Sequence, residues 1–160
     1  PAPDGSYSVT RITYDTTMPN GILVSQDQQT LYVADSNSER LDLDRELRAY
    51  LINDDGSLGD HEVLHVFGRD ASRVHRGIDG MCLDSEGNIV ATAGWELGGP
   101  GPMIYVFSPT GRVIETHPVP CNRPTNCCFG GPNLSTLYVT STDGHFYRAE
   151  TDRIGWALFP

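Results

Sequence analysis

The chain has 160 residues, which is enough for one domain with a hydrophobic core. Hydrophobic residues make up 38% and charged residues 20%, the composition of a soluble globular protein, and no apolar stretch is long enough to cross a bilayer. The formal net charge of −10 argues against a nucleic-acid partner, because phosphate binding requires clustered Lys and Arg. Neither nucleic acid nor a membrane is therefore an expected partner.

Short apolar runs separated by turn residues extend along the whole chain. Its 17 Gly and 11 Pro stand between these runs and favour a β-rich protein. After a first expected strand at 6–13, one unit has expected strands at 22–24, 30–35, 46–53 and 61–67. A second unit has them at 80–83, 88–93, 103–108 and 112–119. A third has them at 127–130, 136–141 and 144–150, with an outer strand at 155–159.

Helix competes with strand in one segment. Residues 39–51 contain good helix formers at a tolerable helical period, which leaves a helix open there. The equivalent place in the next unit, residues 103–108, is clearly strand-like. We therefore expect a strand at 46–53.

The three units repeat one pattern. Asn20, Asp79 and Asn126 each lie before an apolar run, and the second apolar run follows ten or eleven residues later, at Leu31, Ile89 and Leu137. Four-stranded antiparallel units in series are typical of β-propeller blades. The sequence therefore predicts an all-β fold with about three four-stranded blades.

Three blades do not close a propeller. Closed propellers have roughly four to eight blades, and an open arc of three leaves two apolar blade faces exposed. Residues 6–13 resemble the outer strand of a preceding blade. We therefore expect residues 1–160 to be part of a larger propeller, completed by an N-terminal half or by a second copy of the chain.

The cysteines indicate free thiols. Cys82, Cys121, Cys127 and Cys128 form no C-x-x-C pair of the kind that binds zinc or carries redox chemistry. Cys82, Cys127 and Cys128 lie in apolar runs, where Cys behaves as a small buried side chain. Free thiols are typical of a reducing compartment, which favours the cytoplasm over the periplasm or secretion.

Three oxygen-bearing side chains occupy the same place in consecutive units. The residue before the innermost strand of a blade lies at the mouth of the central channel, so Asn20, Asp79 and Asn126 are expected to converge. Oxygen ligands of this kind suit a hard cation such as Ca²⁺ or Mg²⁺, which would polarise a carbonyl and acidify a bound water. Asp79 would then be the general base. The alternative is that Asn-Gly and Asp-Gly serve here only as turn dipeptides.

Other polar residues are weaker candidates. His75 lies four residues before Asp79 and could reach the channel rim, although a single loop His is usually just solvated. Asp35 and Asp84 are expected to bond turn or inter-strand backbone groups. The loop that contains Trp95 and Glu96 could lie over the channel mouth, and blade packing is the expected role of Trp95.

Three motifs together resemble the signatures of one family. The segments PNGILVSQDQQTLYVADS (19–36), IDGMCLDSEGNIVATA (78–93) and PTNCCFGGPNLSTLYVTS (124–141) are similar, in this order, to motifs of the gluconolactonase/regucalcin family, also called the SMP-30 family. Members of that family are six-bladed propellers, and the chain matches the C-terminal half of the family pattern.

The resemblance implies a divalent metal, most often Ca²⁺, and hydrolysis of a sugar lactone. Asn20 and Asp79 fall on metal ligands of the family, and Asn126 is a candidate for binding substrate. Mg²⁺, Mn²⁺ and Zn²⁺ are the other ions to consider. The family's glutamate ligand and its Arg and Asn substrate contacts fall outside residues 1–160. The alternatives are hydrolysis of another ester, such as a phosphotriester, and a propeller that binds calcium or a small ligand without turnover.

Overall fold

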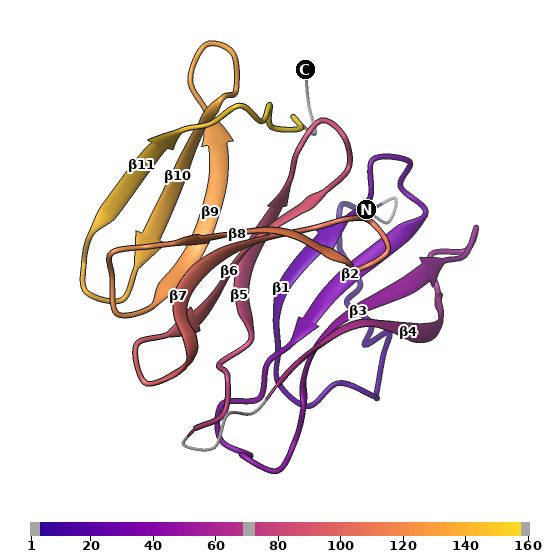
Figure 1. Ribbon diagram of the computed structural model, residues 1–160. Coiled ribbons are helices and arrows are strands. Elements are labelled where there is room, and N and C mark those ends of the chain that lie inside the picture. The colour runs from indigo at the N-terminus through magenta and orange to yellow at the C-terminus, as the bar shows by residue number, and fades with distance from the viewer. Residues whose placement is uncertain (1–3, 69–72, 158–160) are drawn as a thin grey trace.

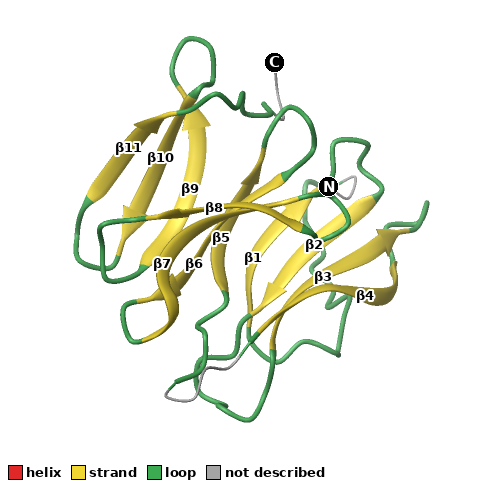
Figure 2. Cartoon of the chain, in the orientation of Figure 1, coloured by secondary structure: helices red, strands yellow, loops and turns green. Residues whose placement is uncertain are grey.

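The computed structural model describes residues 4–68 and 73–157, and these form eleven β-strands and no helix (Figure 1, Figure 2). The first sheet has the order β1 (Pro19–Val24), β2 (Thr30–Asp35), β3 (Arg45–Ile52), β4 (Leu58–Phe67). The second has the order β5 (Ile78–Leu83), β6 (Ile89–Trp95), β7 (Gly98–Phe107), β8 (Val113–Pro118). The third has the order β9 (Pro124–Gly130), β10 (Thr136–Ser141), β11 (Phe146–Glu150).

The three sheets confirm the predicted all-β fold with propeller-like units. Neighbouring strands are antiparallel in every sheet, and each sheet follows the order of the sequence from an innermost to an outermost strand. The innermost strands β1, β5 and β9 contact one another in turn. The described residues contain no helix with the length and apolar character that a membrane span requires.

Turn chemistry joins the strands. In the β3–β4 hairpin, the backbone N of Asn53 donates to the carbonyl of Ser57 at 2.9 Å, and Gly56 has a φ of +80°. Only Gly adopts that backbone conformation without strain, which explains the Asp-Asp-Gly-Ser sequence at this turn. In residues 39–51 the helix alternative is wrong, because β3 pairs along its length with β2 and β4 and this tertiary pairing outweighs local helix propensity.

The third sheet has three strands, where the sequence predicts four. Residues 155–157, the described part of the expected outer strand at 155–159, do not pair with β11. Gly155 instead forms a bridge to Asp84, and the backbone N of Trp156 donates to the carbonyl of Leu83 at 3.0 Å. Leu158 and Phe159 lie outside the described residues. The chain therefore returns from the third sheet to the second.

Residues 6–13 form no strand, although their sequence predicts one. Tyr7 and Val9 are 81% and 97% exposed, so the apolar positions of the pattern are not covered by the described residues. An outer strand exists only where a neighbouring sheet edge supplies hydrogen bonds, and no described strand pairs with this segment. The local pattern is therefore not sufficient to form the strand.

The second sheet contributes to two separate cores because successive side chains of a strand point to opposite faces. On β6, Ile89 and Ala91 pack toward the first sheet with Leu47, Phe67 and other buried side chains. Val90, between them, packs toward the third sheet in a cluster that also contains Val106, Cys127, Leu137 and Val139. The second sheet is therefore buried on both faces between its neighbours.

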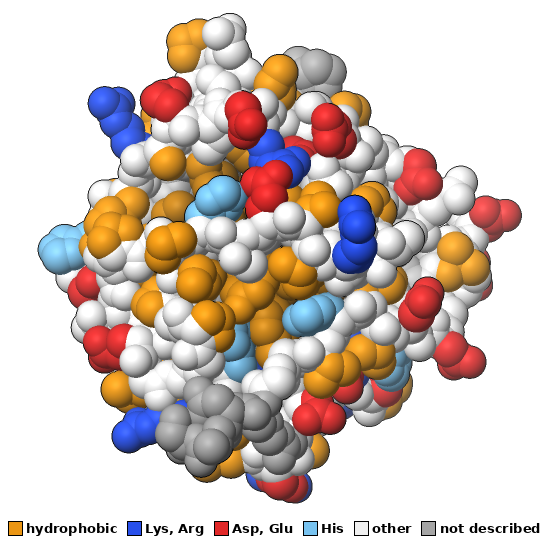
Figure 3. Space-filling view, viewed as in Figure 1, with side chains coloured by type: hydrophobic (Ala, Val, Ile, Leu, Met, Phe, Trp, Pro, Cys, Tyr) orange, Lys and Arg blue, Asp and Glu red, His pale blue; other side chains and the backbone are white. Residues whose placement is uncertain are grey.

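Charged and apolar side chains are distributed differently over the surface. Figure 3 shows acidic side chains dispersed over one face, whereas hydrophobic ones gather in a hollow near its middle. The dispersed carboxylates agree with the net charge of −10. They form no concentrated patch on this face.

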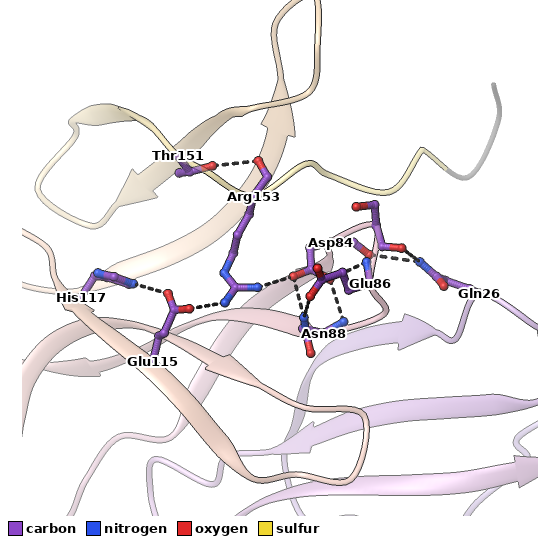
Figure 4. Close-up of polar contacts among 9 residues, drawn as sticks. Gln26, Asp84, Glu86, Asn88, Glu115, His117, Thr151 and Arg153 are labelled. Atoms are coloured by element: carbon purple, nitrogen blue, oxygen red, sulfur yellow. Dashed lines mark hydrogen bonds and ion pairs between the residues drawn. The ribbon is translucent and has the colours of Figure 1, made fainter.

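Arg153 ties the chain that follows β11 to the second sheet (Figure 4). Its Nη1 donates to Oδ2 of Asp84 at 2.7 Å, and its Nη2 donates to Oε1 of Glu115 on β8. Asp84 is 1% exposed and also accepts hydrogen bonds from the backbone N of Glu86 and of Asn88. The hydrogen bond from Arg153 is the main reason that the pKa of Glu115 is lowered, and His117 adds to the effect.

Replacing Arg153 by Leu is expected to lower the free energy of unfolding by about 1–2 kcal/mol. The change removes charge-assisted hydrogen bonds, while Asp84 keeps those from the backbone. The pKa of Glu115 is lower in the folded chain than its ordinary value, so the contact with Arg153 contributes fully to the free energy of unfolding above the ordinary glutamate pKa. This contribution is lost as the pH falls through the folded pKa of Glu115. The difference in the free energy of unfolding between the wild type and Arg153→Leu should therefore become smaller at acidic pH.

Urea denaturation at neutral and at acidic pH measures both effects. Arg112→Leu is the matched control, since Arg112 is exposed in the β7–β8 turn and should change stability by less than about 0.5 kcal/mol. A cost for Arg153→Leu that stays constant down to low pH would contradict the role given to Glu115.

Candidate functional site

The three residues that repeat in the sequence lie around one pocket of about 280 Å³. They lie near the starts of the innermost strands β1, β5 and β9. These three strands lie side by side across the middle of the molecule (Figure 1). The pocket is lined by Asn20, Gly21, Ile22, Asp79, Gly80, Met81, Thr125 and Asn126. The structure thus brings Asn20, Asp79 and Asn126 to one place, as the repeat predicts.

A shift in strand register occurs at each of the three positions. The pairing of β1 with β2 shifts between Pro19 and Ile22, and the pairing of β5 with β6 shifts between Ile78 and Met81. In the third sheet the shift lies at Thr140–Ser141, opposite the start of β9. Such irregularities change the direction of side chains at the end of a strand. Each of the three sheets therefore has a shift in strand register at the edge of the pocket.

Two glycines allow the innermost strands to approach closely enough to form the pocket. A Cβ added to Gly21 would lie 2.6 Å from the carbonyl oxygen of Asp79, and one added to Gly80 would lie 2.8 Å from the Cα of Asn126. Both distances are far shorter than normal contacts between heavy atoms. The Gly that follows Asn20 and Asp79 in the sequence is therefore needed for packing between sheets; both glycines lie within strands and neither has a positive φ, so the turn-dipeptide alternative is wrong.

Asp79 is paired with a residue that the sequence reasoning missed. Nη1 of Arg76 lies 2.6 Å from Oδ2 of Asp79, and the two side chains are 20% and 15% exposed. This Nη1 atom is buried and has no hydrogen-bond partner among the described residues, so the contact is a pairing of charges without hydrogen-bond geometry. The only sequence signal for it is the spacing of three residues between Arg76 and Asp79.

The other two side chains of the pocket offer amide oxygens. Asn20 is exposed and its side chain makes no hydrogen bond within the described residues. Oδ1 of Asn126 accepts a hydrogen bond from the backbone N of Cys127 at 2.9 Å. The described residues contain no cluster of three or more His, Cys, Asp or Glu suited to a metal, so a cation here would rely on Asn oxygens beside the Asp79 carboxylate. That oxygen-only donor set fits Ca²⁺ or Mg²⁺.

His75 is buried, which corrects the expectation of a solvated loop residue. Its ring stacks on Phe67 with centroids 4.5 Å apart, and Nδ1 accepts a hydrogen bond from the backbone N of Gly77 at 2.9 Å. Its Nε2 lies 3.3 Å from the hydroxyl of Tyr105. These contacts hold the loop before Asp79 against the buried rings of Phe67 and Tyr105. The sequence around His75 did not indicate an aromatic partner.

Two aspartates have the structural role that the sequence predicts. Asp35 accepts hydrogen bonds from the backbone N of Thr17 and of Met18, and Asp84 accepts those from Glu86 and Asn88. Both carboxylates are buried and satisfied by backbone groups. Neither lines the pocket that contains Asp79.

The loop between β6 and β7 joins the second and third sheets. The guanidinium of Arg123 lies 5.3 Å from the centre of the Trp95 ring, and the backbone N of Glu96 donates to the carbonyl of Asn122 at 3.0 Å. These contacts agree with the packing role expected for Trp95. They connect sheets and do not include a residue lining the pocket.

All four cysteines are free, as the sequence predicts. Sγ of Cys82 lies 3.8 Å from Sγ of Cys127, and the hydrogen bond between these thiols together with burial raises the pKa of Cys127. Cys128 is exposed, which corrects the expectation that it is buried. Adjacent residues of β9 face opposite sides, and the described residues cover only the side of Cys127.

Comparison with known proteins gives consistent relatives. A family model described as "SMP-30/Gluconolactonase/LRE-like region" matches residues 2–143. The chain is 36% identical to regucalcin of Xenopus laevis over 124 residues, which is 76% of this chain and 36% of the relative. It is 28% identical over 144 residues to 6-deoxy-6-sulfogluconolactonase of Pseudomonas putida, covering 90% of this chain and 44% of that enzyme.

A solved structure agrees with this result. The crystal structure of regucalcin from Agrobacterium tumefaciens, described as a calcium-binding protein, matches with a TM-score of 0.66 and 28% identity, covering 86% of this chain and 42% of that one. The chain thus spans less than half the length of these relatives. Since the family model covers most of its residues, the chain belongs to the SMP-30/gluconolactonase/LRE-like family.

Proposed function

We propose that the chain supplies part of the active site of a divalent-cation-dependent hydrolase that opens a sugar lactone. The observation that carries the proposal is the convergence of Asn20, Asp79 and Asn126 on one pocket. Membership of a family that contains gluconolactonases supports the lactone as substrate, and the name of the Pseudomonas putida relative is an example. The description of the regucalcin structure as calcium-binding supports Ca²⁺ as the ion.

Each side chain has a distinct part in the proposed reaction. Asn20 Oδ1 and the Asp79 carboxylate would hold the cation, and Asn126 would contact the substrate. A divalent cation in such a site polarises the carbonyl and lowers the pKa of water. Asp79 accepts a proton from the attacking water as its oxygen bonds to the lactone carbonyl carbon. The bond from that carbon to the ring oxygen then breaks, and the ring oxygen takes up a proton to become a hydroxyl.

A further polypeptide segment is part of the proposal. Two protein ligands are too few for a cation that takes six to eight oxygen atoms. Ile22 on β1 and Phe146 on β11 are 66% and 83% exposed at the two ends of the row of sheets. Three blades are also fewer than a closed propeller needs. We therefore assign the remaining ligands and blades to an N-terminal half of a six-bladed propeller or to a second copy of the chain.

The experiment tests the completed assembly. After sedimentation has established what accompanies the 17.5 kDa chain, the hydrolysis of a sugar lactone is followed by acid release, with and without a chelator. Removing the cation should reduce the rate at least about a hundredfold, and Ca²⁺ should restore it. Activity that a chelator leaves unchanged would exclude the cation from the mechanism, and a monodisperse monomer with full activity would exclude the completing segment.

A propeller that binds calcium or a small ligand without turnover is the second candidate. The description of the Agrobacterium tumefaciens regucalcin as a calcium-binding protein favours it. The Asp79 carboxylate favours the enzyme, because it can accept a proton as well as bind a cation, whereas an Asn at this place could only bind. Cation binding without hydrolysis of any sugar lactone would decide for this second function.

A further inference from the structure

The Arg76 guanidinium is paired with the Asp79 carboxylate, which a cation in the pocket would need as a ligand. Nη1 of Arg76 contacts Oδ2 of Asp79 at 2.6 Å, and both side chains are more than three-quarters buried. A guanidinium and a bound cation are both positively charged, so they compete for the same carboxylate. Without a cation, the pair neutralises Asp79, the one carboxylate among the described residues that line the pocket.

The contact is suited to displacement. The buried Nη1 atom makes no hydrogen bond among the described residues, so the pair lacks the aligned geometry of a strong fork-like arrangement between Arg and carboxylate. Arg76 belongs to the loop just before β5, and Asp79 belongs to the strand itself. The guanidinium can therefore move away while the carboxylate keeps its place.

We propose that Arg76 is an internal competitor of the cation: it positions the Asp79 carboxylate when the cation is absent and sets the cation affinity by having to be displaced. The inference rests on the proposed function, because it requires that a divalent cation binds Asp79. The inference gives a role to Arg76, a residue that the resemblance to the family motifs does not include. Its physical basis is that two positive groups compete for one oxygen and repel each other at short range.

Calorimetric titration of the completed assembly with CaCl₂ tests the competition. Arg76→Gln should bind Ca²⁺ about tenfold more tightly than the wild type, because a full positive charge beside the site is removed. Arg76→Lys keeps the charge and should stay within about threefold of the wild type. Higher ionic strength should narrow the difference between Arg76→Gln and the wild type, since salt screens the repulsion.

Arg40→Gln is the matched control. It removes the same charge from an exposed pair with Asp42, whose side chains are 61% and 65% exposed, and should leave the affinity unchanged. Thermal melting of each variant confirms that it is folded before titration. As a second measurement, the Nε–H signal of Arg76 in NMR should shift when Ca²⁺ is added, and that of Arg40 should not.

The outcomes separate this inference from the proposed function. Equal affinity in the wild type and Arg76→Gln, or weaker binding in Arg76→Gln, would overturn the competition while the cation site remains. Tighter binding in Arg76→Gln with no hydrolysis of a lactone would support the competition and overturn the hydrolase. Absence of Ca²⁺ binding in both proteins would overturn both.

Discussion

Lactone hydrolysis is expected to fall about a hundred- to ten-thousand-fold when Asp79 is replaced by Asn, the typical effect of losing a general base. The substitution keeps the shape of the side chain and one oxygen that can bind a cation. It removes the negative charge and the group that accepts the proton. Cation affinity should therefore fall by a much smaller factor than the hydrolytic rate.

Asn20→Ala provides the contrast, because it removes a cation ligand and no proton acceptor. It should weaken cation binding and hydrolysis together, and raising the cation concentration should restore part of the rate. Asp60→Asn on the exposed surface of β4 is the control for a general change of charge. The measurements are a cation titration and a lactone assay of each variant in the completed assembly. Full activity in Asp79→Asn would remove Asp79 from the mechanism.

A methyl group at Gly80 is expected to destabilise the fold and disrupt the pocket. The added Cβ would lie 2.8 Å from the Cα of Asn126 and closer still to its side chain, so the first strand of the third sheet must move. Overpacking of this kind costs about 3 kcal/mol. Because β9 carries Asn126, the shift should also weaken substrate binding and hydrolysis.

Gly59→Ala is the matched control for Gly80→Ala. Its added Cβ would meet its nearest atom, the Cβ of Leu51, at an ordinary distance of 3.6 Å, and it also lies in a strand. Urea denaturation should therefore show little change for Gly59→Ala and a large loss for Gly80→Ala. If the two variants have equal stability, the sheets are not held at the spacing that the structure shows.

The repeat in the sequence predicts the strands and the place of the candidate site for a physical reason. Alternation and turn residues are local properties, and they are enough to define β2, β6 and β10. A position that recurs before each innermost strand must recur in space once the blades stack. Asn20, Asp79 and Asn126 therefore meet at one pocket.

What the sequence did not predict depends on contacts between distant residues. The pairing of Arg76 with Asp79 and the burial of His75 follow from how one loop lies on the second sheet. The expected outer strands at 6–13 and 155–159 have strand-like sequences, but a strand also requires an edge to pair with. Residues 151–157 do not pair with the edge strand β11, because Arg153 instead binds Asp84 and Glu115 on the second sheet.

The register shifts at the pocket have a consequence for how the site can evolve. In β1 and β5 they are properties of the backbone and of the glycines at 21 and 80, so the directions of the side chains at 20 and 79 are set mainly by the strands. Substitution of Asn20, which is exposed and makes no side-chain hydrogen bond within the described residues, can therefore alter ligand chemistry at little cost to the scaffold, whereas Asp79 is also paired with Arg76. Specificity can diverge within such a lineage while the two glycines stay fixed.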